Sequence, residues 1–200
     1  MSKARLEAFS DGVLAIIITI MVLELKTPNQ PTLEALRPLI PVLMSYILSF
    51  AYVGIYWNNH HHLLQVSRSV NGSILWANLH LLFWLSLIPF VTGWMGATHF
   101  ASLPVAMYGL NLLLSGLAYS ILVRTLIAHH GKKSALAEAI GRDRKGMASL
   151  ILYTVAVPIA FWDSRIAGAI YALVAALWLI PDTRIERKVQ SKVDSLEDEQ

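Results

Sequence analysis

Ionisable side chains lie within an apolar run near the amino terminus of the chain. Asp11 falls just inside the run from 9 to 25, Arg5 precedes it and Glu24 lies near its far end. A carboxylate inside a membrane is costly unless it faces a bundle interior or a water-filled cavity. Such residues therefore mark an ion path, a proton relay, or a buried Arg5–Asp11 pair that only holds helices together. The residue types alone leave these alternatives open.

The seven histidines raise the question of metal chemistry, because His60, His61 and His62 are consecutive. A membrane metalloenzyme needs several histidine ligands with carboxylates on one side of the membrane. His99 is expected on the opposite side, and few carboxylates accompany the others. The sequence also has no phosphate-binding glycine loop, dinucleotide fingerprint or Ser/His/Asp arrangement. We predict no metal site, no cofactor and no enzymatic activity.

The composition places these residues in a membrane protein. Hydrophobic residues make up 56% of the 200 and charged residues only 14%, well below the share of roughly 25% that is usual in soluble domains. The apolar residues also form long runs separated by polar or Pro/Gly-containing stretches. We predict an all-α integral membrane protein whose residues 1–181 form six transmembrane helices, at about 9–25, 39–57, 74–92, 103–127, 148–162 and 166–180. Residues 182–200 are predicted to be a cytoplasmic tail.

The positive charges predict the orientation of these helices. Of the 16 lysine and arginine residues, all but Lys26, Arg37 and Arg165 lie at the termini or in the connections that share their side. Positively charged connections stay in the cytoplasm. Both termini are therefore predicted to be cytoplasmic, as an even number of spans requires.

The first helix is poorly suited to contact with lipid along its whole length. Its uncharged stretch, Gly12 to Leu23, is ~18 Å long at 1.5 Å per residue, against a hydrocarbon core of ~30 Å. Helical spacing of three or four residues places one set of side chains on a single stripe. The stripe consists of Arg5, Phe9, Gly12, Ile16, Thr19, Ile20 and Leu23.

The first helix also carries a recognisable motif. The pattern Arg5-x-x-x-Phe9-Ser10-Asp11-Gly12-Val13-x-Ala15-Ile16-x-x-Thr19 closely resembles the first-helix signature of the prokaryotic relatives of the lysosomal potassium channel, transmembrane protein 175. The resemblance extends to Trp57-x-x-His60, to Asn78 and to the Ile88-Pro89-Phe90 break. The last three predicted helices match only in number and length.

This resemblance implies a passive, potassium-permeable cation channel that needs no cofactor and lies in a bacterial inner membrane. Each subunit would supply one six-helix repeat, and four identical subunits would surround a central pore lined by the first helix. Partners would be other copies of the chain, the lipid bilayer and monovalent cations, with potassium as the permeant ion and no nucleic acid. The carbonyl filter loop of ordinary potassium channels is missing from the family, and no Thr-Val-Gly-Tyr-Gly run occurs in this sequence.

The resemblance places the constriction of the pore at Ile16, with Ile20 and Leu23 one and two turns further out. Thr19 corresponds to a threonine whose hydroxyl helps cations to pass. A ring of four isoleucine side chains can close a pore by dewetting, because ions lose hydration there without replacement ligands. It suits a gate better than a filter, so only modest selectivity for potassium over sodium is expected. The same aliphatic stripe could instead simply pack against neighbouring helices, as most such stripes do.

The resemblance also assigns a structural role to a set of polar residues. A hydrogen-bonded network would hold the first helix against the second and third, and a buried carboxylate does need such donors. The network consists of Arg5, Ser10, Asp11, Trp57 and His60. Asn78 could join the network or offer an oxygen near the pore, and we favour the network.

Two other functions compete with the channel. In a proton-coupled secondary cation transporter, Asp11 and His60 would form a proton relay. An internal inverted repeat would favour that alternative, and none is visible in the sequence. A purely structural membrane protein is also compatible with the composition, but it leaves the ionisable residues of the first helix unexplained.

Overall fold

A computed structural model describes residues 2–67, 69–131, 134, 137 and 143–179. Residues 182–200, predicted as a cytoplasmic tail, lie outside the described residues, as does residue 180 of the last predicted span. The helices are α1 (Lys3–Leu23), η1 (Glu34–Leu39, a 3-10 helix), α2 (Ile40–Val66), α3 (Gly72–Ser86), α4 (Ile88–Ala97), α5 (Ser102–His130), α7 (Arg144–Ile159) and α8 (Ser164–Leu179).

The predicted all-helical fold is confirmed, since the described residues contain helices and connections but no strand. A helix satisfies all of its interior backbone hydrogen bonds by itself, which a chain in lipid requires. Four segments are long and apolar enough to cross a membrane, namely 3–23, 34–66, 72–97 and 102–130. Helices α7 and α8 have only 16 residues each, fewer than the ~20 that span a bilayer without adjustment.

Short polar and proline-containing sequences determine where the helices begin and end. The side chain of Asn71 caps α3 by accepting a hydrogen bond from the backbone nitrogen of Ile74 at 3.0 Å. Pro89 lies in the first turn of α4, where its missing N–H is harmless to the new helix. The third apolar run is therefore two helices, α3 and α4, which meet at Leu87. Gly131 ends α5 with a φ of 92°, a left-handed value that glycine adopts readily.

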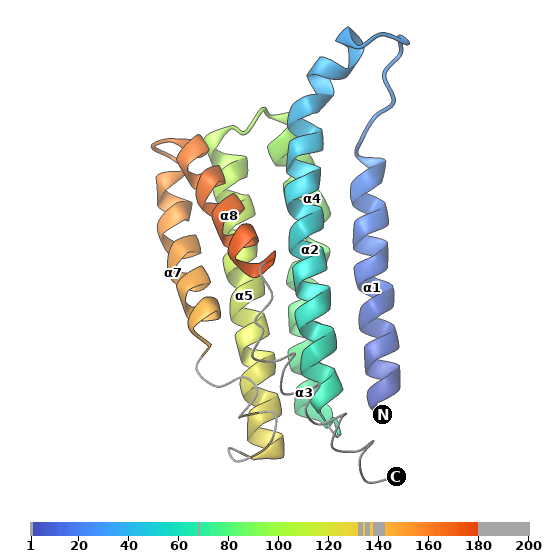
Figure 1. Ribbon diagram of the computed structural model, residues 1–200, viewed down its shortest axis with the longest axis vertical. Helices are drawn as coiled ribbons and strands as arrows, with labels where there is room; N and C mark the ends of the chain where they lie inside the picture. The colour runs from blue at the N-terminus through green and yellow to red at the C-terminus, as the bar shows by residue number, and fades with distance from the viewer. Residues whose placement is uncertain (1, 68, 132–133, 135–136, 138–142, 180–200) are drawn as a thin grey trace, which may run out of the picture.

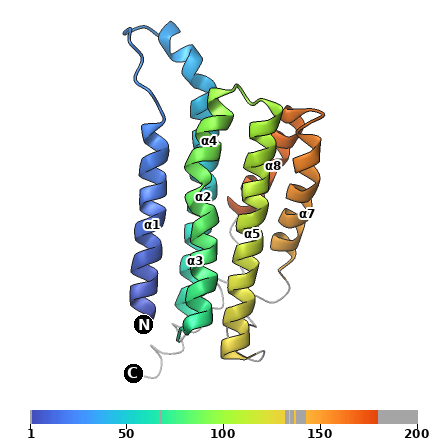
Figure 2. The same cartoon turned by 180° about the vertical axis from the view of Figure 1, so that it is seen from behind.

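The helices form an elongated bundle in which α1 lies along one edge (Figures 1 and 2). Helix α1 packs against α2, α3 and α4, whereas α7 and α8 pack against α5 and each other on the other side. The connection after α1 rises to η1 at the top of Figure 1, and the amino terminus lies at the opposite end.

Two buried apolar clusters hold the bundle together. One joins α1 to α2, α3 and the second half of α5, with Leu14, Leu64 and Leu81 among its members. The other joins α2, α4, the first half of α5, α7 and α8, and it includes Tyr108 and Tyr171. Helices α2 and α5 contribute to both clusters, so they connect the edge helix α1 to the α7–α8 hairpin.

Candidate functional site

The two faces of α1 have different surroundings. One face packs into the bundle through Leu6, Ser10, Leu14, Ile17 and Met21, which are buried. The opposite face is the stripe identified in the sequence, and its large side chains are exposed in the single chain: Phe9 by 49%, Ile16 by 58%, Ile20 by 44% and Leu23 by 78%. The three aliphatic residues are therefore not core residues of their own subunit. Their apolar surface is left for a pore lumen, a neighbouring copy or lipid.

Thr19 presents an oxygen on this exposed face of α1. Its hydroxyl donates to the backbone oxygen of Ile16 at 2.9 Å. Because the proton is directed into the helix, the lone pairs of the hydroxyl oxygen remain available as acceptors. An acceptor without a competing donor is the arrangement that favours a cation over an anion.

Gly12 lies one helical turn from Ile16 towards the amino terminus of α1. A side chain at this glycine would meet no atom within 4 Å. At Gly12 the exposed stripe of α1 is therefore bare backbone, which lies between the large side chains of Phe9 and Ile16.

The amino-terminal half of α1 is attached to α2 and α3 by two separate sets of hydrogen bonds. Trp57 donates from its Nε1 to Oδ1 of Asp11 at 3.0 Å. In the second set, Asn78 Nδ2 donates to Ser10 Oγ at 3.0 Å, and Asn78 Oδ1 lies 2.7 Å from Nε2 of His60. The amide oxygen of Asn78 can only accept, so Nε2 of His60 carries the proton in this contact.

Burial distinguishes the two sets. Ser10, His60 and Asn78 are buried, whereas Asp11 and Trp57 are exposed in the single chain. The buried set is satisfied throughout, because the Ser10 hydroxyl donates in turn to the backbone oxygen of Leu6 at 2.9 Å. A buried polar set of this kind costs little when every member has a partner and much when one is lost.

Arg5 lies apart from both sets. Its side chain is exposed on α1 and makes no hydrogen bond or ion pair with any described residue; only its backbone nitrogen donates, to the backbone oxygen of Ser2 at 3.2 Å. The nearby Lys3 instead makes an ion pair of 3.8 Å with Glu7 and donates to the backbone oxygen of Gln65 at 3.3 Å. In the single chain, the structure brings together all of the predicted network except Arg5.

Helix α1 is also held at its far end. The carboxylate of Glu24 folds onto α4 beside Gly93, where an added Cβ would lie 3.3 Å from Oε2 of Glu24. Glu24, at the carboxyl-terminal end of the apolar stretch of α1, therefore lies against α4. Together with the hydrogen bonds near the amino terminus of α1, this contact holds α1 against the bundle along most of its length.

A second buried set of hydrogen bonds, which no sequence pattern predicts, lies near α4. Ser49 Oγ lies 2.6 Å from Oγ1 of Thr92 and 3.0 Å from the hydroxyl of Tyr108. Single hydroxyl residues in apolar runs follow no spacing pattern, so only the packing of α2, α4 and α5 reveals these hydrogen bonds.

Within the described residues, no group of three or more His, Asp or Glu side chains could hold a metal ion.

Comparison with known proteins connects this geometry with a family. Residues 5–89 match the family model described as endosomal/lysosomal potassium channel TMEM175. A protein named as a potassium channel in Chryseobacterium sp. (strain P1-3) is 56% identical over 190 residues, covering 95% of this chain and 99% of the relative. The chain belongs to the TMEM175 family. The family model covers α1 from Arg5 onward, α2 and α3, which are the helices that carry both sets of hydrogen bonds.

Two further proteins match over most of the chain. A protein named as a potassium channel in Streptomyces collinus is 31% identical over 188 residues, covering 86% of this chain and 89% of the relative. The crystal structure of a lysosomal potassium-selective channel TMEM175 homolog from Chamaesiphon minutus superposes with a TM-score of 0.76 at 26% identity, covering 89% of this chain and 96% of that chain. The arrangement of α1 to α8 is therefore that of a TMEM175 subunit.

Proposed function

We propose that this protein is a passive, potassium-permeable cation channel. The observation that carries the proposal is the 56% identity, over nearly the full length of both chains, to a bacterial protein named as a potassium channel. The exposed stripe of α1 supports it, because Gly12 leaves bare backbone and Thr19 a hydroxyl on a face that no other helix covers, and lipid cannot pair with such polar groups. A pore gives these two residues an aqueous environment.

The pore is formed by four copies of the chain around a central axis, each contributing the exposed face of α1. One helix per subunit encloses a pore only when symmetry repeats it. The position of α1 at the edge of the bundle supports this arrangement, since its outer face is free of the other helices (Figure 1). Membership of the TMEM175 family supports it further.

The constriction is a ring of Ile16 side chains, with rings of Ile20 and Leu23 further out. Four isoleucines around an axis leave a narrow apolar neck that closes by dewetting. Potassium sheds its hydration more readily than sodium, and the Thr19 oxygen offers a partial replacement, so selectivity for potassium is modest. The hydrogen bonds of Asp11 and Ser10 to α2 and α3 hold α1 in position. These two side chains do not line the pore.

The channel lies in the inner membrane of a bacterium with both termini in the cytoplasm. Positive residues concentrate at the termini and in the connections on the same side, which supports this orientation. Ion movement then needs only an electrochemical gradient and no cofactor.

Ion flux into liposomes that contain the purified protein tests the channel and its constriction together. Wild-type protein is expected to pass potassium faster than sodium under a gradient alone. Ile16→Asn places an amide in the apolar neck, and the expected result is a faster potassium flux, because a hydrated neck no longer dewets. The matched control is Ile151→Asn on α7, since Ile151 has nearly the same exposure, 57%; its flux should equal that of the wild type.

Two results would contradict the proposal. Equal flux in Ile16→Asn and wild-type tetramers would place the constriction elsewhere. Absence of passive flux in all three proteins, with transport only against an opposing proton gradient, would favour the transporter that uses Asp11 and His60.

The number of subunits is tested by native mass measurement in a mild detergent. The expected species is a tetramer of the 22.2 kDa chain. A monomer as the only species would exclude a pore built from one α1 helix per subunit.

A further inference from the structure

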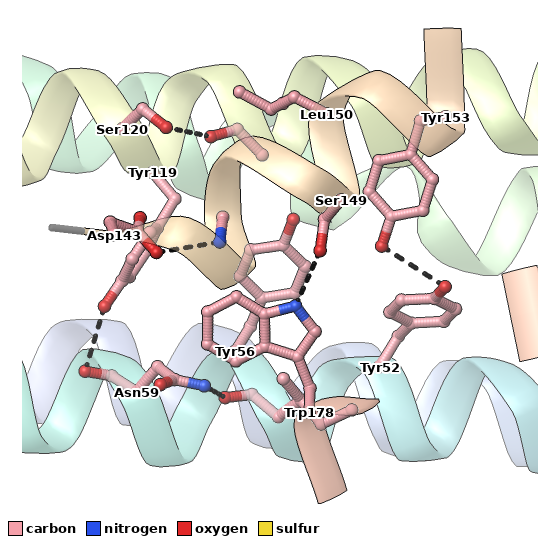
Figure 3. Close-up of a pocket in the computed structure, with 13 residues that line it drawn as sticks. Tyr52, Tyr56, Asn59, Tyr119, Ser120, Asp143, Ser149, Leu150, Tyr153 and Trp178 are labelled. Carbon is pink, nitrogen blue, oxygen red and sulfur yellow. Dashed lines mark hydrogen bonds between the residues drawn. The ribbon is translucent and has the colours of Figure 1, made fainter. Parts of the chain in front are cut away.

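A second candidate site lies in the bundle on the side away from the outer face of α1. A cavity of about 40 Å³ lies between α2, α5, α7 and α8 (Figure 3). A single water needs roughly 10–15 Å³ measured in the same way, so the cavity holds about three waters or one compact organic molecule. Neither the channel nor the hydrogen bonds of α1 use this space.

Five of the thirteen residues that line the cavity are aromatic. Helices α2, α5, α7 and α8 contribute them, and they are Tyr52, Tyr56, Tyr119, Tyr153 and Trp178. The rings pack in pairs: Tyr56 with Tyr119 at 6.2 Å between centroids, and Tyr52 with Tyr153 at 6.3 Å. The faces of aromatic rings carry partial negative charge and attract cations.

Hydrogen bonds hold most of these rings in place without a ligand. The hydroxyl of Tyr119 donates to the backbone oxygen of Asn59 at 3.3 Å, and that of Tyr153 donates to the hydroxyl of Tyr52 at 3.2 Å. The indole of Trp178 donates to the Ser149 hydroxyl at 2.9 Å. A binding molecule would therefore not have to order these side chains, which reduces the entropy cost of binding.

Tyr56 differs from its neighbours in the cavity wall. Its hydroxyl has no hydrogen-bond partner among the described residues, and no dashed line reaches it in Figure 3. The other rings direct their polar atoms to the protein, whereas Tyr56 has a polar atom left for a molecule in the cavity.

The charge of the cavity lining also favours a cation. Asp143 is the one charged side chain among the described residues that line it, and no lysine, arginine or histidine is among them. The Asp143 carboxylate is held at the start of α7 by a hydrogen bond of 2.7 Å from the backbone nitrogen of Gly146 to Oδ1. An anion would meet aromatic faces and a carboxylate, so the cavity excludes it.

We propose that this aromatic cavity is a binding site for a small organic ammonium cation. A quaternary ammonium ion is larger and more weakly hydrated than potassium, so it gives up less solvation in an aromatic enclosure. The ring faces contact its methyl groups, while the carboxylate of Asp143 supplies the opposite charge. The site does not depend on the proposed channel activity, because it is built from other helices and other residues.

Calorimetric titration of the purified detergent-solubilised protein with tetramethylammonium chloride tests the site. Saturable binding is expected, and Asp143→Asn should raise the dissociation constant about tenfold because it removes the charge. Asparagine still caps a helix start, so this variant should stay folded. The matched control is Asp163→Asn, since Asp163 likewise accepts a backbone hydrogen bond, from Arg165 at 2.8 Å, but lies outside the cavity lining; its binding should be unchanged.

Two further measurements distinguish binding in the cavity from uptake of the ion by the detergent micelle. Tyr56→Leu removes one ring and should weaken binding about tenfold as well. The neutral molecule tert-butanol, similar in shape, should not bind. Absence of saturable binding, equal binding of tert-butanol, or unchanged binding in Asp143→Asn would each overturn the proposal. Binding that changes in Ile16→Asn and not in Asp143→Asn would place the cation on α1 instead.

Discussion

Asn78 is the residue on which the buried polar contacts of α1 depend. It donates to Ser10 and accepts from His60, so one amide links α1 and α2 through α3. Both of its partners are buried in the single chain. Because only a side chain with both a donor and an acceptor can satisfy the two partners, an apolar residue of similar size cannot replace it.

Asn78→Leu is therefore expected to destabilise the protein by about 1–3 kcal/mol for each buried group left without a partner. Thermal unfolding in detergent measures the change as a lower melting temperature. The control is Asn58→Leu, because Asn58 is exposed on α2 and its loss should shift the melting temperature little. Equal shifts in the two variants would show that the Asn78 hydrogen bonds add nothing to stability.

At the scale of the elements, small residues decide how closely the helices approach. A Cβ added to Gly96 of α4 would lie 2.7 Å from the backbone Cα of Val42 and 2.5 Å from Oγ of Ser45, both on α2. Such close backbone approach through small residues is how membrane helices pack in the absence of a hydrophobic driving force. The register of α4 against α2 depends on this glycine, and α4 is the helix on which Glu24 of α1 rests.

Gly96→Ala should force α2 and α4 apart and cost about 1–3 kcal/mol through overpacking. A fall in the melting temperature in detergent would report it. Gly54→Ala on α2 is the control: an added Cβ meets nothing within 4 Å there, and the better helix propensity of alanine should leave stability equal or raised by up to ~1 kcal/mol. If Gly96→Ala melted at the wild-type temperature, the close contact would not limit the packing.

At the scale of the whole molecule, the bundle leaves one helix face uncovered. Helices α2, α3 and α4 cover only the inner face of α1, and the stripe with Ile16 and Thr19 stays exposed. In a single subunit, therefore, no other described helix covers the apolar and polar side chains on this face of α1. The proposed assembly of four copies around that face would cover this surface.

The orientation of the whole molecule is open to direct labelling, because the chain contains no cysteine. Ser2 and Thr27 flank α1 and are exposed, so a single cysteine at either reports the side on which that end lies. In intact cells, a membrane-impermeant maleimide is expected to label Thr27→Cys, and to label Ser2→Cys only after permeabilisation. The reverse pattern would place the amino terminus outside and contradict the orientation inferred from the positive charges.

The membrane class, the all-helical fold and the family were accessible from the sequence because each depends on local information. Apolar runs predict helices in lipid without reference to any other segment. The third run shows the limit of this reasoning, because the sequence indicates a break at Ile88-Pro89-Phe90 but not that α3 and α4 are separate helices that meet at Leu87. The pattern of the first helix likewise indicated a stripe but not which element would cover it.

The sequence by itself determined that the chain spans a membrane, and it placed Ile16, Ile20 and Leu23 on one helical stripe. Only the tertiary structure decided that this stripe is exposed, that Arg5 lies outside the hydrogen-bonded set, and that four tyrosines and Trp178 enclose a cavity. The physical reason is the separation along the sequence over which each kind of interaction acts. Helical periodicity acts over three or four residues, whereas the Asn78 contact to Ser10 joins residues 68 positions apart and depends on which helices pack together.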